Sequence, residues 1–257
     1  MPDKDYIKSI EKCFVILDCM ESADSLLNLE DIVRETGYKK TTCFRLLKTM
    51  RKLGIVESAP VGKKYQFGHR IISIGSAALK KMNLRESALP ILKQLRDETG
   101  ETVNLTILSG SNVLFIERVM SDYLVNVNIN IGDRLPVYYS SMGKAILSFL
   151  PETHIAEILS QLRFEPKTDR TIVSEAALMQ EIIKIRRKGF AINDEELEMG
   201  LRTVAAPVFN YKGEAFAAIN IAWLTARRPS RKTFANFAQK VVAAASQISS
   251  LMGYSPD

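Results

Sequence analysis

Two short amphipathic segments separated by a glycine constrain this chain more than any other feature. They lie between residues 26 and 54, where the sequence reads LLNLEDIVRETGYKKTTCFRLLKTMRKLG. Apolar residues recur at helical spacing in the first segment and predict one helix face: Leu26, Leu29, Ile32 and Val33. Gly37 stands where this helix must end, because glycine readily adopts the left-handed conformation that a tight turn between helices needs.

The second segment predicts another helix, with an apolar inner stripe and a basic outer face. Thr41 or Thr42 is its expected N-cap. The inner stripe is predicted to hold Cys43, Leu46, Leu47, Met50 and Leu53. The outer face is predicted to hold Lys40, Thr41, Phe44, Arg45, Lys48, Arg51 and Lys52. Two short helices joined by a glycine-containing turn, the second outwardly basic, indicate a helix-turn-helix.

Charge is distributed unevenly around this helix pair. Residues 1–33 contain 3 Lys/Arg and 8 Asp/Glu, a net charge of −5, whereas residues 34–70 contain 10 Lys/Arg and 2 Asp/Glu, a net charge of +8. A merely solvated surface normally mixes both signs. A basic block beginning near the second helix suits a polyphosphate partner, since each neutralised phosphate releases condensed counterions. The net charge of +6 over the whole chain permits an anionic partner without requiring one.

The chain as a whole has the composition of an ordinary globular protein. Its 257 residues allow one large or two ordinary domains, and 46% of them are hydrophobic. The three cysteines, Cys13, Cys19 and Cys43, are an odd number and favour reduced thiols in a cytoplasmic protein. We expect no secretory leader, because the N-terminal stretch MPDKDYIKSIEKC has no apolar core. We expect no membrane partner, because no run of about 18 apolar residues occurs.

A β-hairpin is expected directly after the helix pair. Ser9 is a candidate cap for a bracing first helix. Two short strands, Ile55–Glu57 and Tyr65–Phe67, flank a turn that contains Pro60 and Gly62. Such a hairpin is a wing, and Lys63 and Lys64 at its tip would touch phosphate or a minor groove. An ordinary basic turn is the alternative for these two lysines.

The rest of the chain changes character and predicts a second domain. We expect residues 1–70 to form a winged helix-turn-helix domain, residues 71–83 a linker helix, and residues 84–257 a further domain. The segment His69–Met82 is apolar enough to pack against another subunit as well. A helix over Leu84–Thr99 is predicted to be capped by Ser87, with Pro90 in its first turn and Gly100 at its end.

Strands and helices in the second domain follow one another without regular βαβ alternation. Further strands are expected at Thr102–Leu108, Val113–Val119, Leu124–Asn130, Phe190–Ile192, Arg202–Phe209 and Ala215–Trp223. Further helices are expected at Ser141–Leu150, His154–Leu162, Glu175–Lys188 and Arg231–Leu251. This order indicates an α+β fold with a mainly antiparallel sheet.

The sequence resembles the IclR family of bacterial transcription regulators over nearly its whole length. The N-terminal part matches through SIEKCFVILDCM, LNLEDIVRETGYKKTTCFRLLKTMRKLGIVES and YQFGHRIISIG. The C-terminal part matches through LPVYYSSMGKAILSFLP, TDRTIVSEAALMQEIIKIRRKGFAINDEEL and GLRTVAAPVF. The resemblance implies a winged helix that reads double-stranded DNA, a GAF-like effector domain, and homodimers or homotetramers on palindromic operators of catabolic genes.

Carried onto this chain, the resemblance identifies a recognition helix over Lys40–Leu53. The implied DNA contacts are Lys39, Lys40, Thr41, Thr42, Phe44, Arg45 and Lys48, with Lys63 and Lys64 from the wing. Arg45 is the candidate for guanine, since its fork can bond O6 and N7 together. A phosphate clamp is an equal alternative for Arg45, because half or more of protein–DNA hydrogen bonds go to the backbone.

The implied effector site begins at a helix start, Ser140-Ser141-Met142-Gly143. Backbone N–H groups of Met142 and Gly143 at the positive end of the helix dipole would suit a carboxylate, and Gly143 would let a ligand approach. Simple capping by the serines is the alternative. The remaining implied pocket positions are Asn193, Thr203, Asn220 and Ala222.

These four positions depart from the commonest family pattern, which is Asp, Cys, Ser and Ser. Loss of the Asp and Cys argues against a glyoxylate-like effector. The neutral donors and acceptors of Asn193, Thr203 and Asn220 can meet several hydroxyl groups. We therefore predict a polyhydroxylated carboxylate, a sugar acid such as an aldonate.

Catalysis is not expected. The two histidines, His69 and His154, stand in no nucleophile motif, and no Cys/His cluster or Gly-rich phosphate loop occurs. No metal and no cofactor is predicted. The alternative function is a nucleic-acid-binding protein whose second domain serves only oligomerisation.

Overall fold

The chain divides into an N-terminal unit, Met1–Lys81, and a C-terminal unit, Met82–Asp257. The structure is a computed structural model that describes residues 6–60, 62–80, 83–123, 129–227 and 231–255. The helix expected as a linker clusters with the N-terminal unit. Its role as a connector between domains stays a prediction.

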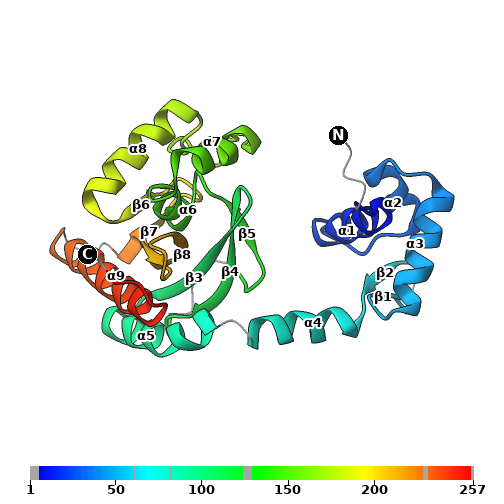
Figure 1. The fold of residues 1–257 in the computed structure, drawn as a ribbon, viewed down its shortest axis with the longest axis horizontal. Coiled ribbons are helices and arrows are strands. Elements are labelled where there is room, and N and C mark those ends of the chain that lie inside the picture. Colours follow the sequence, from blue (N-terminus) through cyan, green and yellow to red (C-terminus); the bar gives the residue numbers. More distant parts are fainter. Residues whose placement is uncertain (1–5, 61, 81–82, 124–128, 228–230, 256–257) are drawn as a thin grey trace. The chain divides into compact units, whose positions relative to one another are not determined.

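The N-terminal unit is a three-helix core followed by a hairpin and a further helix (Figure 1). Its elements are α1 (Lys8–Glu21), α2 (Leu29–Thr36), α3 (Lys40–Lys52), β1 (Val56–Ser58), β2 (Tyr65–Phe67) and α4 (His69–Lys80). Each of the first three helices and β1 contributes to one buried cluster, which holds Ile16, Ile32, Cys43, Leu47, Met50 and Val56. The helix-turn-helix and its wing are therefore confirmed.

The turn between α2 and α3 forms as the glycine predicts. Gly37 has a φ of 68°, and its N–H donates to the carbonyl of Val33 at 3.0 Å. Asn28 caps α2 through a reciprocal pair of hydrogen bonds with Asp31. Because this capping box starts the helix at Leu29, Leu26 lies outside it, and the prediction that Leu26 belongs to the helical face is wrong.

Three other local predictions for this unit are wrong. Thr41 and Thr42 do not cap α3, because the helix begins at Lys40 and places both inside it. Ser9 does not cap α1, whose first residue is Lys8. Leu53 follows the last turn of α3 and is 49% exposed, so it does not belong to the inner stripe.

The hairpin pairs β1 with β2 antiparallel, with Glu57 opposite Gln66. The first strand lies one residue later than predicted, and Val61 in the turn is outside the described residues. The wing is joined to the start of α4 by His69, whose Nδ1 lies 2.8 Å from Glu57 Oε1. Arg70 in turn donates to the carbonyl of Leu53 at 3.0 Å. These contacts link β1, α3 and α4 within one unit.

The C-terminal unit is a six-stranded antiparallel sheet covered by helices, which confirms the α+β fold. Its strands are β3 (Thr102–Ser109), β4 (Asn112–Val119), β5 (Arg134–Pro136), β6 (Ala191–Asp194), β7 (Leu201–Phe209) and β8 (Ala215–Leu224), in the order β5-β4-β3-β8-β7-β6. Its helices are α5 (Asn83–Thr99), α6 (Ser141–Leu147), α7 (Glu152–Gln161), α8 (Glu175–Lys188), α9 (Arg231–Leu251) and the 3₁₀ turn η1 (Thr225–Arg227).

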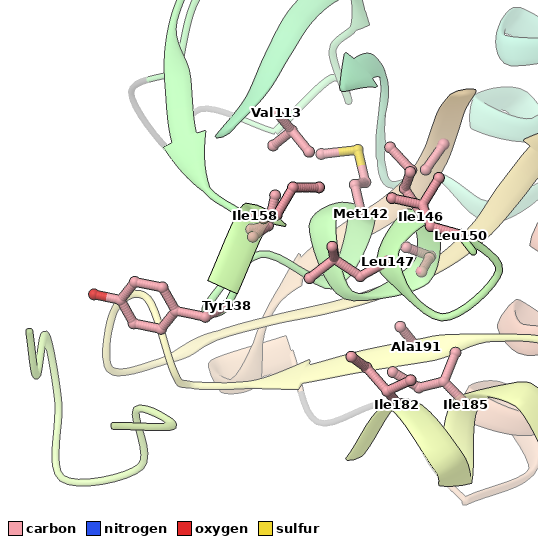
Figure 2. Close-up of a cluster of buried hydrophobic side chains, with 14 of the residues drawn as sticks. Val113, Tyr138, Met142, Ile146, Leu147, Leu150, Ile158, Ile182, Ile185 and Ala191 are labelled. Atoms are coloured by element: carbon pink, nitrogen blue, oxygen red, sulfur yellow. The ribbon is translucent and has the colours of Figure 1, made fainter. Parts of the chain in front are cut away.

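The two faces of the sheet are covered by different helices. Helices α5 and α9 lie against one face, and α6 lies against the other with α7 and α8 beyond it (Figure 1). Figure 2 shows apolar side chains of α6, among them Met142, Ile146 and Leu147, packed between β4, α7 and α8. The cluster anchors α6, so the start of that helix is held against the sheet.

Some boundaries in this unit differ from the predictions. Ser87 and Pro90 lie inside α5, which begins at Asn83, so neither acts at its start. Helix α6 ends at Leu147, before the expected Leu150. Of the strand expected at Leu124–Asn130, residues 124–128 are outside the described residues, and the remaining two are not in a strand. Strand β5 was not predicted, because its three residues include Pro136.

Candidate functional site

The outward face of α3 carries a row of exposed basic side chains. Exposed residues of the predicted DNA-contact set are Lys39, Lys40, Thr41, Phe44, Arg45, Lys48 and Lys63. Thr42 and Lys64, also predicted, are half-buried. Phe44 is 51% exposed in the middle of this row, and its position leaves an apolar ring open to a partner. The surface joins cations to one aromatic ring, a combination that can meet phosphates and base edges.

Two features modify this surface. Lys40 pairs with Glu30 on α2, with Nζ 2.7 Å from Oε1, and the hydrogen bond from Lys40 holds the pKa of Glu30 below its usual value. Lys63, in the wing turn, has a φ of 51°, which is unfavourable for a residue with a Cβ. A groove between α3 and β1 is lined by Lys48, Arg51 and Lys52 of the helix and by the three residues of the strand, one of which is Glu57. Arg51 and Lys52 were predicted on the outer face but not among the contacts.

A second candidate site is a cavity in the C-terminal unit, between the start of α6 and the sheet. Its volume, counted as the space open to the centre of a water-sized sphere, is about 40 Å³. Polar lining residues are Thr102, Asn104, Arg118, Ser140, Ser141, Asn193, Thr203 and Asn220. The other lining residues are Phe115, Ile129, Leu135, Met142, Leu197, Leu201, Ala222, Trp223 and Leu224. Seven of the eight predicted effector positions therefore line one cavity, and Gly143 does not.

Strand register explains how distant segments meet here. Arg118 of β4 lies opposite Asn104 of β3, which lies opposite Asn220 of β8. In the next row Thr102, Ala222, Thr203 and Asn193 are paired in succession across β3, β8, β7 and β6. Side chains in such rows share one face of a sheet. The floor of the cavity is therefore a ladder of polar side chains across neighbouring strands.

The start of α6 forms the opposite wall. Ser140 is the N-cap, and the N–H of Gly143 donates to its Oγ at 3.3 Å. Ser141 Oγ lies 2.5 Å from Thr203 Oγ1, which ties the helix to β7. The expectation that the Gly143 N–H points free toward a ligand is therefore wrong, and the alternative of a serine cap describes this helix start.

Gly143 has a packing role instead. A Cβ at this position would lie 2.4 Å from Val137 Cα and 2.5 Å from its carbonyl oxygen. Glycine is required because the helix passes directly over the backbone of residue 137. The close approach is to the chain itself and not to a ligand.

Asn193 also uses its amide within the protein. Its Nδ2 donates to the carbonyl of Tyr139 at 2.5 Å, and its Oδ1 accepts from the N–H of Glu196 at 3.0 Å. It therefore holds the segment before α6 and the segment after β6 together at the rim of the cavity. Its contribution is to the shape of the cavity more than to free hydrogen-bonding capacity.

Three polar lining residues escaped the sequence-based prediction: Thr102, Asn104 and Arg118. A signal for two of them was present, because TVNLTIL alternates polar and apolar residues on β3. In a strand whose two faces are both covered, polar residues at every second position indicate a buried polar site. Arg118 could be assigned to the cavity only from the pairing of β4 with β3, and the sequence pattern does not reveal that pairing.

The described part of the chain contains no group of three or more His, Cys, Asp or Glu side chains placed to hold a metal ion. No helix within it has the length and apolarity needed to cross a membrane.

Comparisons with known proteins agree with this architecture. Residues 9–60 match the IclR helix-turn-helix domain, and residues 76–250 match the bacterial transcriptional regulator IclR C-terminal domain. The chain is 31% identical to the HTH-type transcriptional regulator XynR of Escherichia coli (strain K12) over 248 residues, 96% of this chain and 98% of that protein. It is 29% identical to the transcriptional repressor IclR of the same strain over 254 residues, 98% of this chain and 92% of that protein.

A solved structure extends the likeness to the fold. The crystal structure of the Thermotoga maritima IclR superposes with a TM-score of 0.71 at 27% sequence identity, covering 97% of this chain and all of that one. The relatives that match are transcriptional regulators and not enzymes. With a winged helix-turn-helix before an α+β domain, this chain belongs to the IclR family of DNA-binding bacterial transcriptional regulators.

Proposed function

We propose that this regulator is a cytoplasmic repressor of a catabolic operon and that a small carboxylate, a sugar acid such as an aldonate, controls it. The observation that carries the effector class is the polar floor of the cavity. It contains the amides of Asn104 and Asn220 and the hydroxyl groups of Thr102 and Thr203. Neutral groups that both donate and accept suit a ligand with several hydroxyl groups.

The proposed mode of DNA binding is a recognition helix in the major groove of a palindromic operator. Support comes from the exposed row on α3, with Arg45 as the base-reading candidate and Lys48 as a phosphate contact. Lys63 and Lys64 of the wing would then contact the backbone or minor groove. The left-handed conformation of Lys63 supports a requirement for its side chain beyond the turn itself.

A homodimer, or a homotetramer built from dimers, is the proposed assembly. At the start of α1, Ile10 and Phe14 of the helix and the preceding Ile7 are exposed, Phe14 to 61%. On α4 the side chains of Ile72 and Ile74 are also exposed. Clustered exposed apolar side chains such as Ile7, Ile10 and Phe14 mark association surfaces. A two-fold pair of winged helices would match a palindrome with half-sites about 34 Å apart, or a multiple of that spacing.

Control would operate through two arrangements of the winged helices. Effector binding in the C-terminal unit would favour one spacing over the other through α4. A ligand can shift such an equilibrium only by its difference in affinity for the two arrangements. The proposal therefore requires that the effector changes operator affinity and that the operator changes effector affinity by the same factor.

Calorimetric titration of the full chain with a panel of aldonates and aromatic acids tests the effector class. We expect an aldonate to bind, and the same compound to lower the affinity for the protein's own promoter fragment. Binding of aromatic acids alone would contradict the sugar-acid proposal. Binding to DNA that no small acid alters would instead favour the alternative, in which the C-terminal domain serves only oligomerisation.

A further inference from the structure

We propose that Arg118 and Asn104 form a two-point subsite for a 2-hydroxy acid, in which Arg118 holds the carboxylate and Asn104 accepts a hydrogen bond from the neighbouring hydroxyl group. The inference rests on the proposed effector function and deepens it. It assigns the orientation of the ligand and selects 2-hydroxy acids over 2-oxo acids. Neither residue belongs to the set that sequence reasoning assigned to the effector.

The charge of the cavity lining favours a carboxylate near Arg118. Arg118 is the sole charged side chain among the described residues that line it, and those residues include no carboxylate. Burial lowers the pKa of Arg118, but an arginine remains charged at neutral pH. The charge of Asp133, outside the cavity lining, acts in the opposite direction to burial. Because no carboxylate of the described part of the chain lines the cavity itself, the guanidinium makes it favourable for an anionic ligand. The guanidinium is positioned because its NH1 donates to the carbonyl of Ile129 at 2.5 Å.

The side-chain oxygen of Asn104 favours a ligand group that donates a hydrogen bond. Its Nδ2 donates to Asn220 Oδ1 at 2.8 Å, which fixes the plane of the amide. Its Oδ1 is buried and has no hydrogen-bond partner among the described residues, and the residue as a whole is 3% exposed. A buried carbonyl oxygen without a partner is unfavourable. An amide oxygen only accepts hydrogen bonds, so the ligand atom that satisfies it must be a donor.

The register places the two groups next to each other. Arg118 and Asn104 are directly opposite residues of β4 and β3, and such residues have Cβ atoms about 4.5–5.5 Å apart. In a 2-hydroxy acid the carboxylate and the hydroxyl group are on adjacent carbons, so both can be reached at once. A 2-oxo acid presents an acceptor at the second position and would leave Asn104 Oδ1 unsatisfied.

The start of α6 complements this orientation. Ser140 already satisfies the Gly143 N–H, and Ser141 is hydrogen-bonded to Thr203. The hydroxyl groups of both serines are therefore already engaged within the protein. The carboxylate would lie toward β4, and the remaining hydroxyl groups of a sugar acid would extend along the sheet toward Asn220 and Thr203.

Ligand pairs that differ at one group test the subsite on the wild-type protein. Full-length protein is titrated calorimetrically with L-threonate, D-arabinonate and D-gluconate, and the tightest binder is compared with its 2-oxo counterpart and its amide. We expect the acid to bind at least about tenfold more tightly than either analogue. Equal affinity for the acid and the 2-oxo compound would overturn the role of Asn104. Binding of an aldonate without preference over its amide would overturn the role of Arg118.

Variants separate the subsite from the proposed function. Arg118→Gln should weaken the acid about thirtyfold or more and abolish the preference of acid over amide. Asn104→Leu should abolish the preference of the hydroxy acid over the oxo acid. Arg163→Gln, at an exposed position outside the cavity, is the matched control and should change neither ratio.

These measurements distinguish failure of the Arg118–Asn104 subsite from failure of the sugar-acid effector proposal. An aldonate that binds wild type and Arg118→Gln with the same acid-over-amide ratio would refute the subsite and leave the sugar-acid effector standing. A wild-type protein that binds none of the acids would refute both. If Arg118→Gln does not fold, the three-ligand comparison on wild type still decides the question, and Arg118→Lys supplies a variant that keeps the charge.

Discussion

Lys144 of α6 and Glu196, in the loop after β6, form an ion pair inside the C-terminal unit. Their Nζ and Oε1 atoms are 2.5 Å apart, and Lys144 has no exposed surface. Burial raises the pKa of Glu196, while the charge of Lys144 acts in the opposite direction. Because the N–H of Glu196 donates to Asn193, the pair also holds a lining residue of the cavity. The pair therefore connects the stability of the domain to the shape of the cavity beside α6.

Replacing Lys144 by methionine should destabilise the C-terminal unit by about 3–5 kcal/mol at neutral pH, because Glu196 would be left as a buried charge without its partner. Denaturant unfolding followed by the fluorescence of Trp223, the single tryptophan, reports on this unit. Lys184→Met removes the cation of the exposed pair with Glu181 and is the control, with an expected effect under about 1 kcal/mol. Similar losses in the two variants would contradict the structural role of the buried pair.

The decrease in the free energy of unfolding caused by Lys144→Met should depend on pH. The folded-state pKa of Glu196 is raised, so its stabilising contribution is fully present below its unfolded pKa near 4.5 and is lost as pH rises through the folded value. Lys144 lowers this pKa, so the folded-state pKa of Glu196 should rise further in Lys144→Met. The stabilising contribution of Glu196 should then keep falling up to a higher pH than in the wild type. The difference between variant and wild type should therefore shrink on acidification, and Glu196→Gln in the variant background should flatten the pH profile.

Gly143→Ala should lower the free energy of unfolding of the C-terminal unit by about 1–3 kcal/mol, because the added Cβ would clash with the backbone of Val137. The effect should appear without any effector. Gly75→Ala on α4 is a suitable control, since a Cβ there meets nothing within 4 Å and alanine favours a helix. A Gly143→Ala protein of wild-type stability that merely binds effector less well would restore the idea that this glycine serves ligand approach.

Arg45→Ala should relax sequence preference at one operator position at a cost of about 1–3 kcal/mol, if its fork reads guanine. Lys64→Ala should weaken binding almost equally on all sequences and reduce the slope of log affinity against log salt by about one. Fluorescence anisotropy with operator variants at several salt concentrations measures both. A change in base preference in Lys64→Ala would mean that the wing reads sequence.

Glu30→Gln should raise DNA affinity a few-fold while leaving thermal stability nearly unchanged. Glu30 holds Lys40 through an exposed ion pair, and such pairs contribute little to folding. Without the carboxylate, Lys40 is available to phosphate, and one repulsive charge is removed from the surface. Glu21→Gln makes the same charge change at the end of α1. An equal gain from both substitutions would attribute the effect to net charge and not to the release of Lys40.

Local patterns predicted the helix-turn-helix and several elements because their signals are short in range. Gly37 ends α2 by its own conformational freedom, and Glu175–Lys188 forms α8 with the predicted bounds. Helix starts were less predictable. Asn28 and Ser9 both have side chains able to cap, yet Asn28 caps its helix and Ser9 does not. The difference depends on which residue begins the helix, and packing of the whole segment decides that.

The sequence, through its resemblance to the family, identified Ser140, Asn193, Thr203 and Asn220 as candidate effector positions, and these residues, at the start of α6 and on β6, β7 and β8, line one cavity. Only the tertiary structure decided that Arg118 and Asn104 join them. Their proximity depends on the register of β4 against β3, which is set by long-range pairing across the sheet. The structure likewise decided the role of Gly143, because a backbone contact between a helix and a preceding segment leaves no periodic trace in the chain.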